Sequence, residues 1–411
     1  MTYSLWHGFA DMASVVKNGP FVLTRGEGAY VFDAEDNRYI DATAGLWFTN
    51  VGHGRTEIAD AVAAQLGKLA HFSGFGDHAA DVSIELAERL AAIAPVAGSK
   101  IFFTSGGSDA VETAAKLARR YWHEVGQPDR TIMVGRSKAY HGMHVAGTSL
   151  AGIPANGEGY GELMPGVESI AWDDAKSLLG LIERIGAERI AAFFCEPIIG
   201  AGGVYLPPDG YLDEVRGICR DHGILFVADE VVTGFGRGGA QEWFASSRFD
   251  LAPDMITTAK GLTSGYVPMG AVFIAPHLAD PFFGGGVWWR HGYTYGGHAG
   301  AAAAALANLD ILERENLLQR ASALEGELAE AFSPLAGLDA VAEVRTGLGA
   351  VTAVQLADPA QAPTAVAHLR RAGVVTRAAG QGALQVSPSF VMTTEQVRDM
   401  ADRFGGVLEQ L

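Results

Sequence analysis

A regular alternation of two patterns begins near residue 100 and limits the folds open to this chain. Short apolar runs occur at Ile101–Thr104, Thr131–Val134, Ala191–Cys195, Ile224–Ala228, Met255–Thr258 and Ala271–Ala275. Between several of them lie segments with the apolar spacing of amphipathic helices, at Asp109–Trp122, Asp174–Ile185 and Leu212–Asp221. Parallel strands covered by helices on both faces carry such continuous apolar runs. The alternation predicts an α/β fold whose large domain has a mostly parallel central sheet covered by helices.

The two ends of the chain follow a different pattern. The segment AYVFDAEDNRYIDA, residues 29–42, alternates apolar and polar residues around a turn-rich centre, which is typical of a β-hairpin. The tail predicts a long charged helix from about Leu309 through Ala331, strands at Ala350–Leu356 and Ala383–Val386, and a last helix from Thr394. We expect both ends to form one smaller α+β domain. The expected boundaries are 1–45 and 309–411 for the small domain, and 46–308 for the large domain.

Charge and cysteine content exclude several classes of protein. The 411 residues include 30 Lys and Arg against 47 Asp and Glu, and the formal net charge of −17 repels phosphate backbones and anionic membranes. Cys195 and Cys219 cannot form a disulfide framework, and His141 and His144 lack a third metal ligand nearby. We therefore expect no nucleic acid, membrane or metal partner. Without a signal-peptide pattern or an apolar run of about 18 residues, the expected location is the cytoplasm.

A candidate anion site follows the first apolar run. That run ends in the segment SGGS, residues 105–108, and a helix with Asp109 and Glu112 spaced like a capping pair is expected to follow. Free N–H groups, a hydroxyl and a helix dipole at one point suit a single phosphate. Ligands of open α/β sheets bind at the carboxyl ends of strands, where this segment lies. An ordinary strand-to-helix turn is the alternative.

A pair of carboxylates, Asp229 and Glu230, follows the run Ile224–Ala228. A charge at the end of a buried strand needs a partner or a function, so a structural ion pair is one interpretation and a cofactor contact another. The next loop, Gly234–Gly239, fits G-x-G-x-x-G and makes a nicotinamide dinucleotide site a competitor. The match is weak, because other residues separate this loop from the strand and only a short segment follows it before Pro253.

Lys260 stands where the run Met255–Thr258 ends, and no other charged residue flanks it. Most lysines are solvated surface groups, but burial lowers the pKa of a lysine and makes its amine a Schiff-base nucleophile. A phosphate cradle, a buried aspartate and a buried lysine on neighbouring strand ends are the parts that a pyridoxal phosphate site requires. The three features in this order predict such a site.

Further motifs lie along the whole chain. They are Ala44–Trp47, Asn50–His53, Thr104–Ala110, Tyr140–Gly142, Glu196–Pro197, Gly200–Gly203, Asp229–Val231, Gly234–Arg237, Pro253–Asp254, Ala259–Gly261 and Gly292–Tyr295. In this order and spacing, the chain resembles the class III, fold-type I pyridoxal-phosphate aminotransferases, the omega-transaminase group. The resemblance implies pyridoxal 5'-phosphate as the cofactor and a homodimer with shared active sites.

The resemblance implies catalytic roles for Lys260 and Asp229. Lys260 is expected to form the Schiff base and to shuttle the proton between substrate and cofactor, while Asp229 keeps the pyridine nitrogen protonated. The other implied cofactor contacts are Gly107 and Ser108 at the phosphate, Tyr140 stacked on the ring with His141 after it, Val231 on the opposite face, Glu196 nearby, and Thr294 reaching the phosphate of the neighbouring subunit. A structural carboxylate is the alternative for Glu196. Gly106 stands in place of a serine in the family's phosphate motif.

The substrate contacts implied by the resemblance are Trp47, with Phe48, Phe75 and Tyr140 as further aromatic candidates, and Arg377. An aromatic wall at Trp47 favours apolar amine side chains, and the alternative is a core tryptophan. Arg377 lies where omega-transaminases carry an arginine that swings in to pair with a carboxylate and out for an uncharged group. A surface arginine is the alternative there.

The sequence thus predicts an aminotransferase that moves an amino group from an omega-amino acid or amine to an alpha-keto acid, with pyruvate as the expected acceptor. The rivals within the family are 4-aminobutyrate, ornithine-type and diaminopelargonate transaminases, and an aminomutase. Two rivals come from other classes. One is a nicotinamide-dependent oxidoreductase that uses the loop Gly234–Gly239, and the other is a non-catalytic binding protein on the same fold.

Overall fold

A seven-stranded sheet forms the centre of the molecule in the computed structural model, which describes residues 3–411. Its strands are β4 Lys100–Thr104, β10 Gly270–Ile274, β9 Met255–Thr258, β8 Leu225–Asp229, β7 Ile190–Cys195, β5 Ile132–Arg136 and β6 Val167–Ile170, in that spatial order. Strand β10 runs antiparallel to both of its neighbours, and every other pairing is parallel. The predicted α/β class with a mostly parallel sheet is confirmed. The sequence pattern predicted six of these strands and missed β6.

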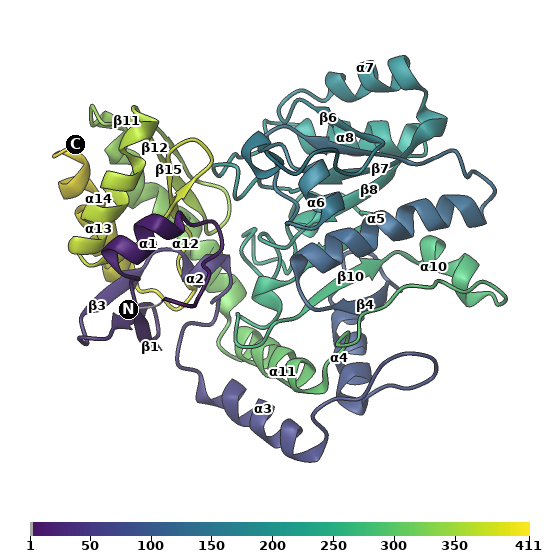
Figure 1. Ribbon diagram of the computed structural model, residues 1–411, viewed down its shortest axis with the longest axis horizontal. Helices are drawn as coiled ribbons and strands as arrows, with labels where there is room; N and C mark the ends of the chain where they lie inside the picture. The colour runs from purple at the N-terminus through teal and green to yellow at the C-terminus, as the bar shows by residue number, and fades with distance from the viewer. Residues whose placement is uncertain (1–2) are drawn as a thin grey trace.

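Helices cover both faces of this sheet (Figure 1). Along β7, Phe193 packs in one apolar cluster with α7 Lys176–Ile185 and α8 Tyr211–Asp221, whereas Phe194 packs in another with α5 Gly107–Glu124. Successive side chains of a strand point to opposite faces, so both faces are buried. The other helices of this body are α3 Thr56–Lys68, α4 Asp81–Ala92, α6 Val145–Leu150, α9 Ala245–Arg248, α10 Pro276–Phe283 and α11 Ala299–Arg314.

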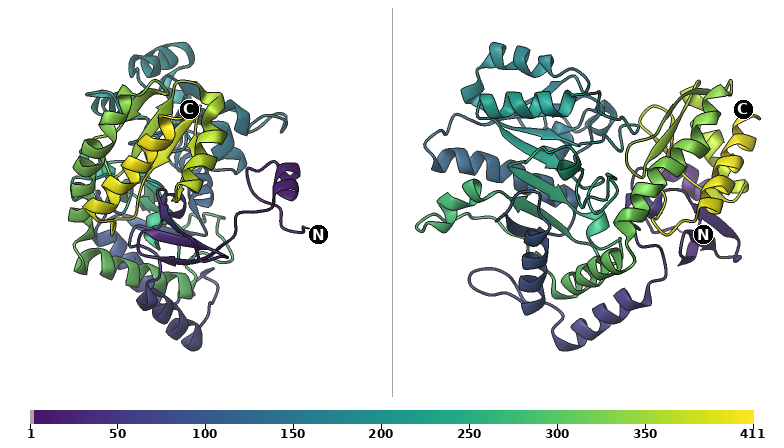
Figure 2. Two further views of the ribbon diagram at one scale, coloured as in Figure 1. Left: turned by 90° about the vertical axis from the view of Figure 1, so that its left-hand side faces the viewer. Right: turned by 180° about the vertical axis from the view of Figure 1, so that it is seen from behind.

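The two ends of the chain lie side by side and build two further sheets (Figures 1 and 2). The first contains β1 Leu23–Glu27, β2 Tyr30–Asp33, β3 Arg38–Asp41 and β13 Val374–Val375, and the second contains β11 Val341–Arg345, β12 Thr352–Leu356, β15 Ala383–Val386 and β14 Ala378–Ala379. Strand β13 pairs with β3 in parallel, so the two chain ends share one sheet. The helices here are α1 Met12–Asn18, α2 Ala44–Trp47, α12 Leu317–Phe332, α13 Ala362–Arg371 and α14 Thr394–Leu408.

Two details of the helix predictions are wrong. The helix expected from about Leu309 through Ala331 is two helices, because Asn316 adopts a left-handed backbone with φ 53° and separates α11 from α12. The helix expected from Asp109 begins two residues earlier, at Gly107, and no side chain caps it. The Asp109 carboxylate instead accepts a hydrogen bond from the backbone N–H of Ser105.

No helix within residues 3–411 combines the length and the apolar character that a bilayer crossing requires. Over the same range, no group of three or more His, Cys, Asp or Glu residues is arranged to hold a metal ion. The proposed domain boundaries stay a prediction, and the one at 308/309 lies inside α11.

Candidate functional site

Lys260 lies at the edge of the central sheet where β8 and β9 end. Strand β8 ends at Asp229, which is in register with Thr257 of β9, and Lys260 follows two residues after the end of β9. The parallel register therefore brings the carboxylate and the amine to the same edge of the sheet. Lys260 has a left-handed backbone with φ 42°, and such strain in a residue with a side chain concentrates at functional sites.

Burial lowers the pKa of Lys260 from 10.5 to about 8. The carboxylates of Asp229 and Glu196 act in the opposite direction, and the cations Arg377 and Arg237 add to the lowering. A lysine with this pKa is a neutral amine in a large fraction of molecules at mildly alkaline pH. The structure therefore supplies a lysine that can act as a nucleophile and as a base.

The Asp229 carboxylate is buried and held by three groups. Its Oδ1 accepts from the backbone N–H of Val231 and from the hydroxyl of Thr257, both at 3.1 Å. Its Oδ2 lies 2.7 Å from Nδ1 of His141, which is itself buried. The other ring nitrogen of His141 is buried without a hydrogen-bond partner. His141 thus lies against Asp229 and fixes the carboxylate in one orientation.

Glu196 connects the segment of Tyr140 to a glycine-rich loop. Its carboxylate accepts from the backbone N–H of Tyr140 at 2.8 Å and from that of Gly200 at 2.9 Å. Burial raises the pKa of Glu196, and it also raises that of the Tyr140 hydroxyl. These two bonds indicate that Glu196 positions Tyr140. Its carboxylate also acts on Lys260, whose pKa it raises.

The first turn of α5 forms a cradle of backbone N–H groups suited to a small anion. Because no side chain caps this helix, the N–H groups of its first turn are left to bind another acceptor. A Cβ on Gly107 would come within 2.9 Å of Val231, and one on Gly142 would come within 2.6 Å of the hydroxyl of Ser108. The Ser108 hydroxyl accepts from the backbone N–H of Met143 at 3.1 Å. The cradle therefore needs glycine at both positions and brings Ser108 next to the segment that carries Tyr140.

Arg377 follows β13 and is half-buried, with no ion pair to any residue within the described range 3–411. Its cation lowers the pKa of both Tyr140 and Lys260, so its guanidinium faces the same site. Burial lowers the pKa of Arg377 itself. A partly buried guanidinium without a carboxylate is suited to bind an anionic ligand.

The aromatic candidates Trp47 and Phe48 differ in their surroundings. Trp47 is buried in an apolar cluster with Ile198 and Val204, and its backbone is left-handed with φ 71°. Phe48 is partly exposed and lies over Gly45 and Gly265, where any Cβ would overlap its ring. The packing of Trp47 agrees with its reading as a core tryptophan, and its pocket role stays a prediction.

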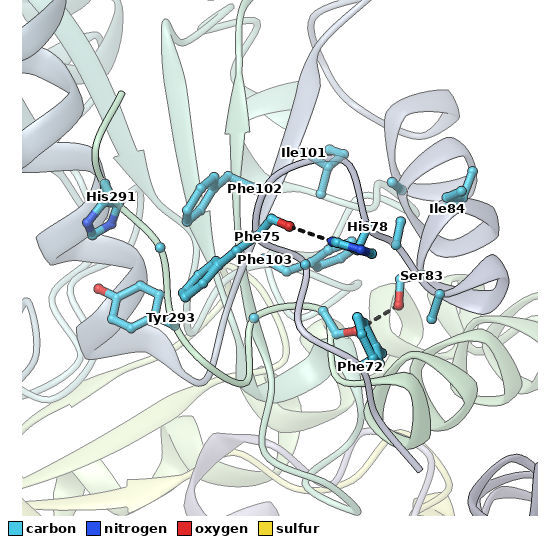
Figure 3. A pocket seen from close by; sticks show the side chains of 17 residues that line it. Phe72, Phe75, His78, Ser83, Ile84, Ile101, Phe102, Phe103, His291 and Tyr293 are labelled. Carbon is cyan, nitrogen blue, oxygen red and sulfur yellow. Dashed lines mark hydrogen bonds between the residues drawn. The ribbon is translucent and has the colours of Figure 1, made fainter. Parts of the chain in front are cut away.

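Phe75 lies elsewhere, at a surface pocket of about 290 Å³. Phe75 lines this pocket with Phe103 of β4 and with Tyr293, and a Cβ on Gly292 would come within 2.7 Å of its ring (Figure 3). Thr294 is exposed on the same loop, and its carbonyl accepts a hydrogen bond from His71. The lining of this pocket includes none of the residues that surround Lys260.

Two residues near Lys260 and Asp229 were given no role from the sequence. Thr257 holds Asp229, and the register of two parallel strand ends is the signal that could have found it. Arg237 is fully buried, and its guanidinium donates to the carbonyls of Ala350 and Pro388 and to the Asn50 side chain. Burial lowers the pKa of Arg237 to about 9. Glu230 was predicted as one of a pair of carboxylates with Asp229, with a structural ion pair as one interpretation.

Glu230 is a buried structural carboxylate. It accepts from the hydroxyls of Thr233 and Ser246 and from two backbone N–H groups, and burial raises its pKa. This network anchors the loop that follows β8. Its four donors face the carboxylate from within the chain, so Glu230 has no free oxygen directed to a ligand.

The glycine-rich loop Gly234–Gly239 does not support a dinucleotide site. The loop is a series of turns, and the next helix, α9, has only four residues. Its glycines make room for protein neighbours, since Cβ atoms on Gly236 and Gly238 would meet Leu318 and Ala245. A dinucleotide fingerprint joins a strand directly to a longer helix. The oxidoreductase alternative is therefore not favoured.

Comparison with known proteins gives matches over almost the whole chain. The family described as "Aminotransferase class-III" matches residues 12–408. A putrescine–pyruvate aminotransferase of Pseudomonas aeruginosa is 38% identical, covering 95% of this chain and 91% of that protein. An omega-amino acid–pyruvate aminotransferase of Pseudomonas putida is 36% identical, covering 95% of this chain and 92% of that protein.

Solved structures give the same result. An amine transaminase from an uncultivated Pseudomonas species, described as PLP-bound, has a TM-score of 0.95 at 36% identity and covers 100% of this chain and 99% of its own. A transaminase from the marine bacterium Virgibacillus has a TM-score of 0.95 at 34% identity, covering 98% of this chain and 96% of its own. The fold and the order of the elements are thus those of these transaminases.

Proposed function

Because the chain belongs to the class-III aminotransferase family, it is an aminotransferase, and we propose that it moves an amino group from an omega-amino acid or amine to pyruvate. We propose pyridoxal phosphate as its cofactor. The observation that carries the proposal is the placement of Lys260, with a pKa lowered to about 8, at the same sheet edge as the fixed carboxylate of Asp229.

The donor set at this edge fits pyridoxal phosphate. The uncapped first turn of α5, with Gly107 and Ser108, offers N–H groups and a hydroxyl to a phosphate. Asp229 offers a fixed anion to a pyridinium nitrogen, and Lys260 offers an amine to an aldehyde carbon. When bound, this cofactor serves as an electron sink that stabilises negative charge on the substrate carbon next to the amino group.

Lys260 performs the proton transfers in this proposal. Its amine would hold the cofactor when no substrate is present, and would be free for proton transfer once a substrate amine is bound. The free Lys260 amine then takes the proton from the substrate Cα, for which its lowered pKa is favourable because a general base must be unprotonated. Lys260 later returns the proton on the cofactor side, at C4′.

Asp229, Tyr140 and Val231 orient the cofactor in this proposal. Asp229 keeps a proton on the ring nitrogen, and the bonds from His141, Thr257 and the Val231 N–H hold its carboxylate in place. We assign Tyr140 to one face of the ring and Val231, which contacts Gly107, to the other. The backbone bond from Tyr140 to Glu196 fixes the position of its ring.

Arg377 accounts for the acceptance of two unlike substrates. A keto acid carries a carboxylate, and an amine donor such as putrescine does not, so one pocket must serve both. The guanidinium of Arg377 has no ion pair within residues 3–411 and lies near Tyr140, which supports its assignment as the partner of the substrate carboxylate. The names of the relatives, which include putrescine–pyruvate and beta-alanine–pyruvate aminotransferases, support donors of both kinds.

We also propose a homodimer with shared sites. Phe75 lines an exposed aromatic pocket whose lining includes none of the residues around Lys260, and Thr294 is exposed on the loop that carries Tyr293 of the same pocket. This placement supports their serving the site of a neighbouring subunit. The division into a large domain, 46–308, and a small domain from both chain ends belongs to the same proposal, as does a cytoplasmic location.

The experiment that tests the function uses the purified chain loaded with pyridoxal phosphate. We expect a yellow protein whose visible absorbance is lost on adding β-alanine or putrescine and restored by pyruvate, with alanine as the product. A chain that takes up no cofactor, or that binds it without reacting with any amine, would contradict the proposal. Measuring reduction of nicotinamide nucleotides in parallel tests the rival oxidoreductase.

A further inference from the structure

A hairpin of residues 199–205 contacts several segments that carry candidate substrate residues. Ile199 and Tyr205 pair as an antiparallel bridge, and Gly200–Val204 forms the loop between them. We call residues 199–205 the GAGG hairpin. It lies between the segment that leads to Tyr140 and the segment that follows Arg377, as the contacts below show. The hairpin therefore separates the Tyr140 segment from the Arg377 segment.

The backbone of the GAGG hairpin packs against backbone on both of its sides, so closely that glycine is required there. A Cβ on Gly202 would overlap the carbonyl oxygen of Lys138, two residues before Tyr140. A Cβ on Gly380 would overlap the carbonyl oxygen of Gly202. The N–H of Gly380, three residues after Arg377, donates to the carbonyl of Ala201 at 3.1 Å. The Arg377 segment thus rests directly on the hairpin backbone.

Arg345, in the last position of β11, anchors the GAGG hairpin from the small-domain side. Its Nε donates to the carbonyl of Val204 at 2.9 Å, and its guanidinium also donates to the carbonyl of Gly203 at 2.7 Å. The guanidinium stacks over the ring of Tyr205 at 4.3 Å. The remaining partners of Arg345 are the side chains of Glu343 and Gln355.

The hairpin conformation that Arg345 holds is strained. Val204 has a left-handed backbone with φ 54°, which is unusual for a β-branched residue and persists only when the surroundings enforce it. Val204 is completely buried against Trp47 in one apolar cluster. Loss of the Arg345 bonds would let Val204 relax, and the hairpin would shift beneath Gly380.

We propose that Arg345 and Gly380 are positioning residues that set the resting place of Arg377 through the GAGG hairpin, and thereby the preference for substrates that carry a carboxylate. This inference rests on the proposed function. Arg345 contacts neither substrate nor cofactor in it and acts only through the hairpin carbonyls. Substrates without a carboxylate do not use Arg377, so their turnover is insensitive to its position.

The first test is Arg345→Met, which keeps the side-chain length and removes the fork of donors. Single-turnover half-reactions of the loaded enzyme are followed by absorbance with β-alanine, which has a carboxylate, and with putrescine, which has none. We expect kcat/KM for β-alanine to fall at least about tenfold, mainly through KM, while that for putrescine changes less than about threefold. Glu343→Gln is the matched control, since it removes the charge of an exposed partner of Arg345 and leaves the hairpin bonds in place.

The second test is Gly380→Ala, which keeps the inference falsifiable if Arg345→Met does not fold. Gly380 is exposed, and the added Cβ would push the Arg377 segment away from Gly202. Gln381→Ala is its control. We expect the same selective loss for β-alanine, and no further loss when Gly380→Ala is combined with Arg377→Ala. Equal losses for both amines, or additive losses in the double variant, would overturn the inference. A wild-type protein that reacts with neither amine would instead contradict the proposed function.

Discussion

The centre around Lys260 and the loops of Phe75 and Thr294 differ in how complete they are within one chain. Asp229 has three partners from its own chain, and Glu196 accepts from two backbone N–H groups, so contacts within one chain hold both carboxylates in place. Phe75, in contrast, exposes 53% of its surface beside an open pocket. This difference agrees with the proposed homodimer, in which the groups around Lys260 come from one subunit and Phe75 and Thr294 serve the site of a neighbouring subunit.

The largest expected effect comes from removing the amine of Lys260. Lys260→Ala should lower kcat for β-alanine and pyruvate by at least about a thousandfold, because covalent attachment and proton transfer both use this group. Lys176→Ala, at an exposed lysine, is the control and should leave kcat unchanged. Retention of transamination by Lys260→Ala would show that the centre has been placed at the wrong residue.

The second change tests the carboxylate of Asp229, which three hydrogen bonds hold in place. Asp229→Asn keeps the shape and most hydrogen bonds but removes the charge that keeps the ring nitrogen protonated. We expect kcat to fall about a hundredfold or more with little change in the dissociation constant of pyridoxal phosphate. Stopped-flow rates and equilibrium titration separate the two quantities. A weaker affinity with an unchanged rate would make Asp229 a binding residue only.

The pH dependence tests the environment of Lys260. Its pKa is lowered from 10.5 to about 8, so the reactive neutral amine is lost as pH falls below 8 and is nearly complete above pH 9. The rate at which the cofactor-free protein attaches pyridoxal phosphate should rise about fiftyfold from pH 6 to 8 and then level off. A rate that keeps rising to pH 10 would indicate an unburied lysine.

The smallest expected effect concerns Thr294, which is exposed on its loop. Thr294→Ala should weaken pyridoxal phosphate binding about tenfold, because one hydrogen bond to a charged phosphate is lost. Mixing Thr294→Ala subunits with Lys260→Ala subunits should restore one native site in each mixed dimer. Activity that stays at the sum of the two parent variants after subunit exchange would place Thr294 in its own subunit's site and end the distinction between the two regions.

Those parts of the site that follow from strand order could be predicted from the sequence. Lys260 and Asp229 each follow an apolar run, and parallel pairing brings such positions to one edge. The bond between His141 and Asp229 could not be predicted, because it joins a loop and a strand end that are 88 positions apart in the sequence. Patterns along the chain carry no information on such pairings.

The same limit applies to the fold. The apolar runs predicted six strands of the central sheet, but not β6, whose sequence VESI is only half apolar and whose first three residues are partly or fully exposed. The break between α11 and α12 was missed because Asn316 is compatible with a helix and only its backbone conformation ends one. Arg345 was missed because its partners are backbone carbonyls, which leave no signature in the side-chain sequence.

The most direct test of the central claim is to locate the covalent cofactor link. The purified protein, loaded with pyridoxal phosphate, is reduced with borohydride, digested, and analysed by mass spectrometry. The account predicts a single modified peptide that contains Lys260, and no modification when the protein is first converted by excess putrescine. Modification at another lysine, or at none, would contradict the assignment of Lys260 as the catalytic amine.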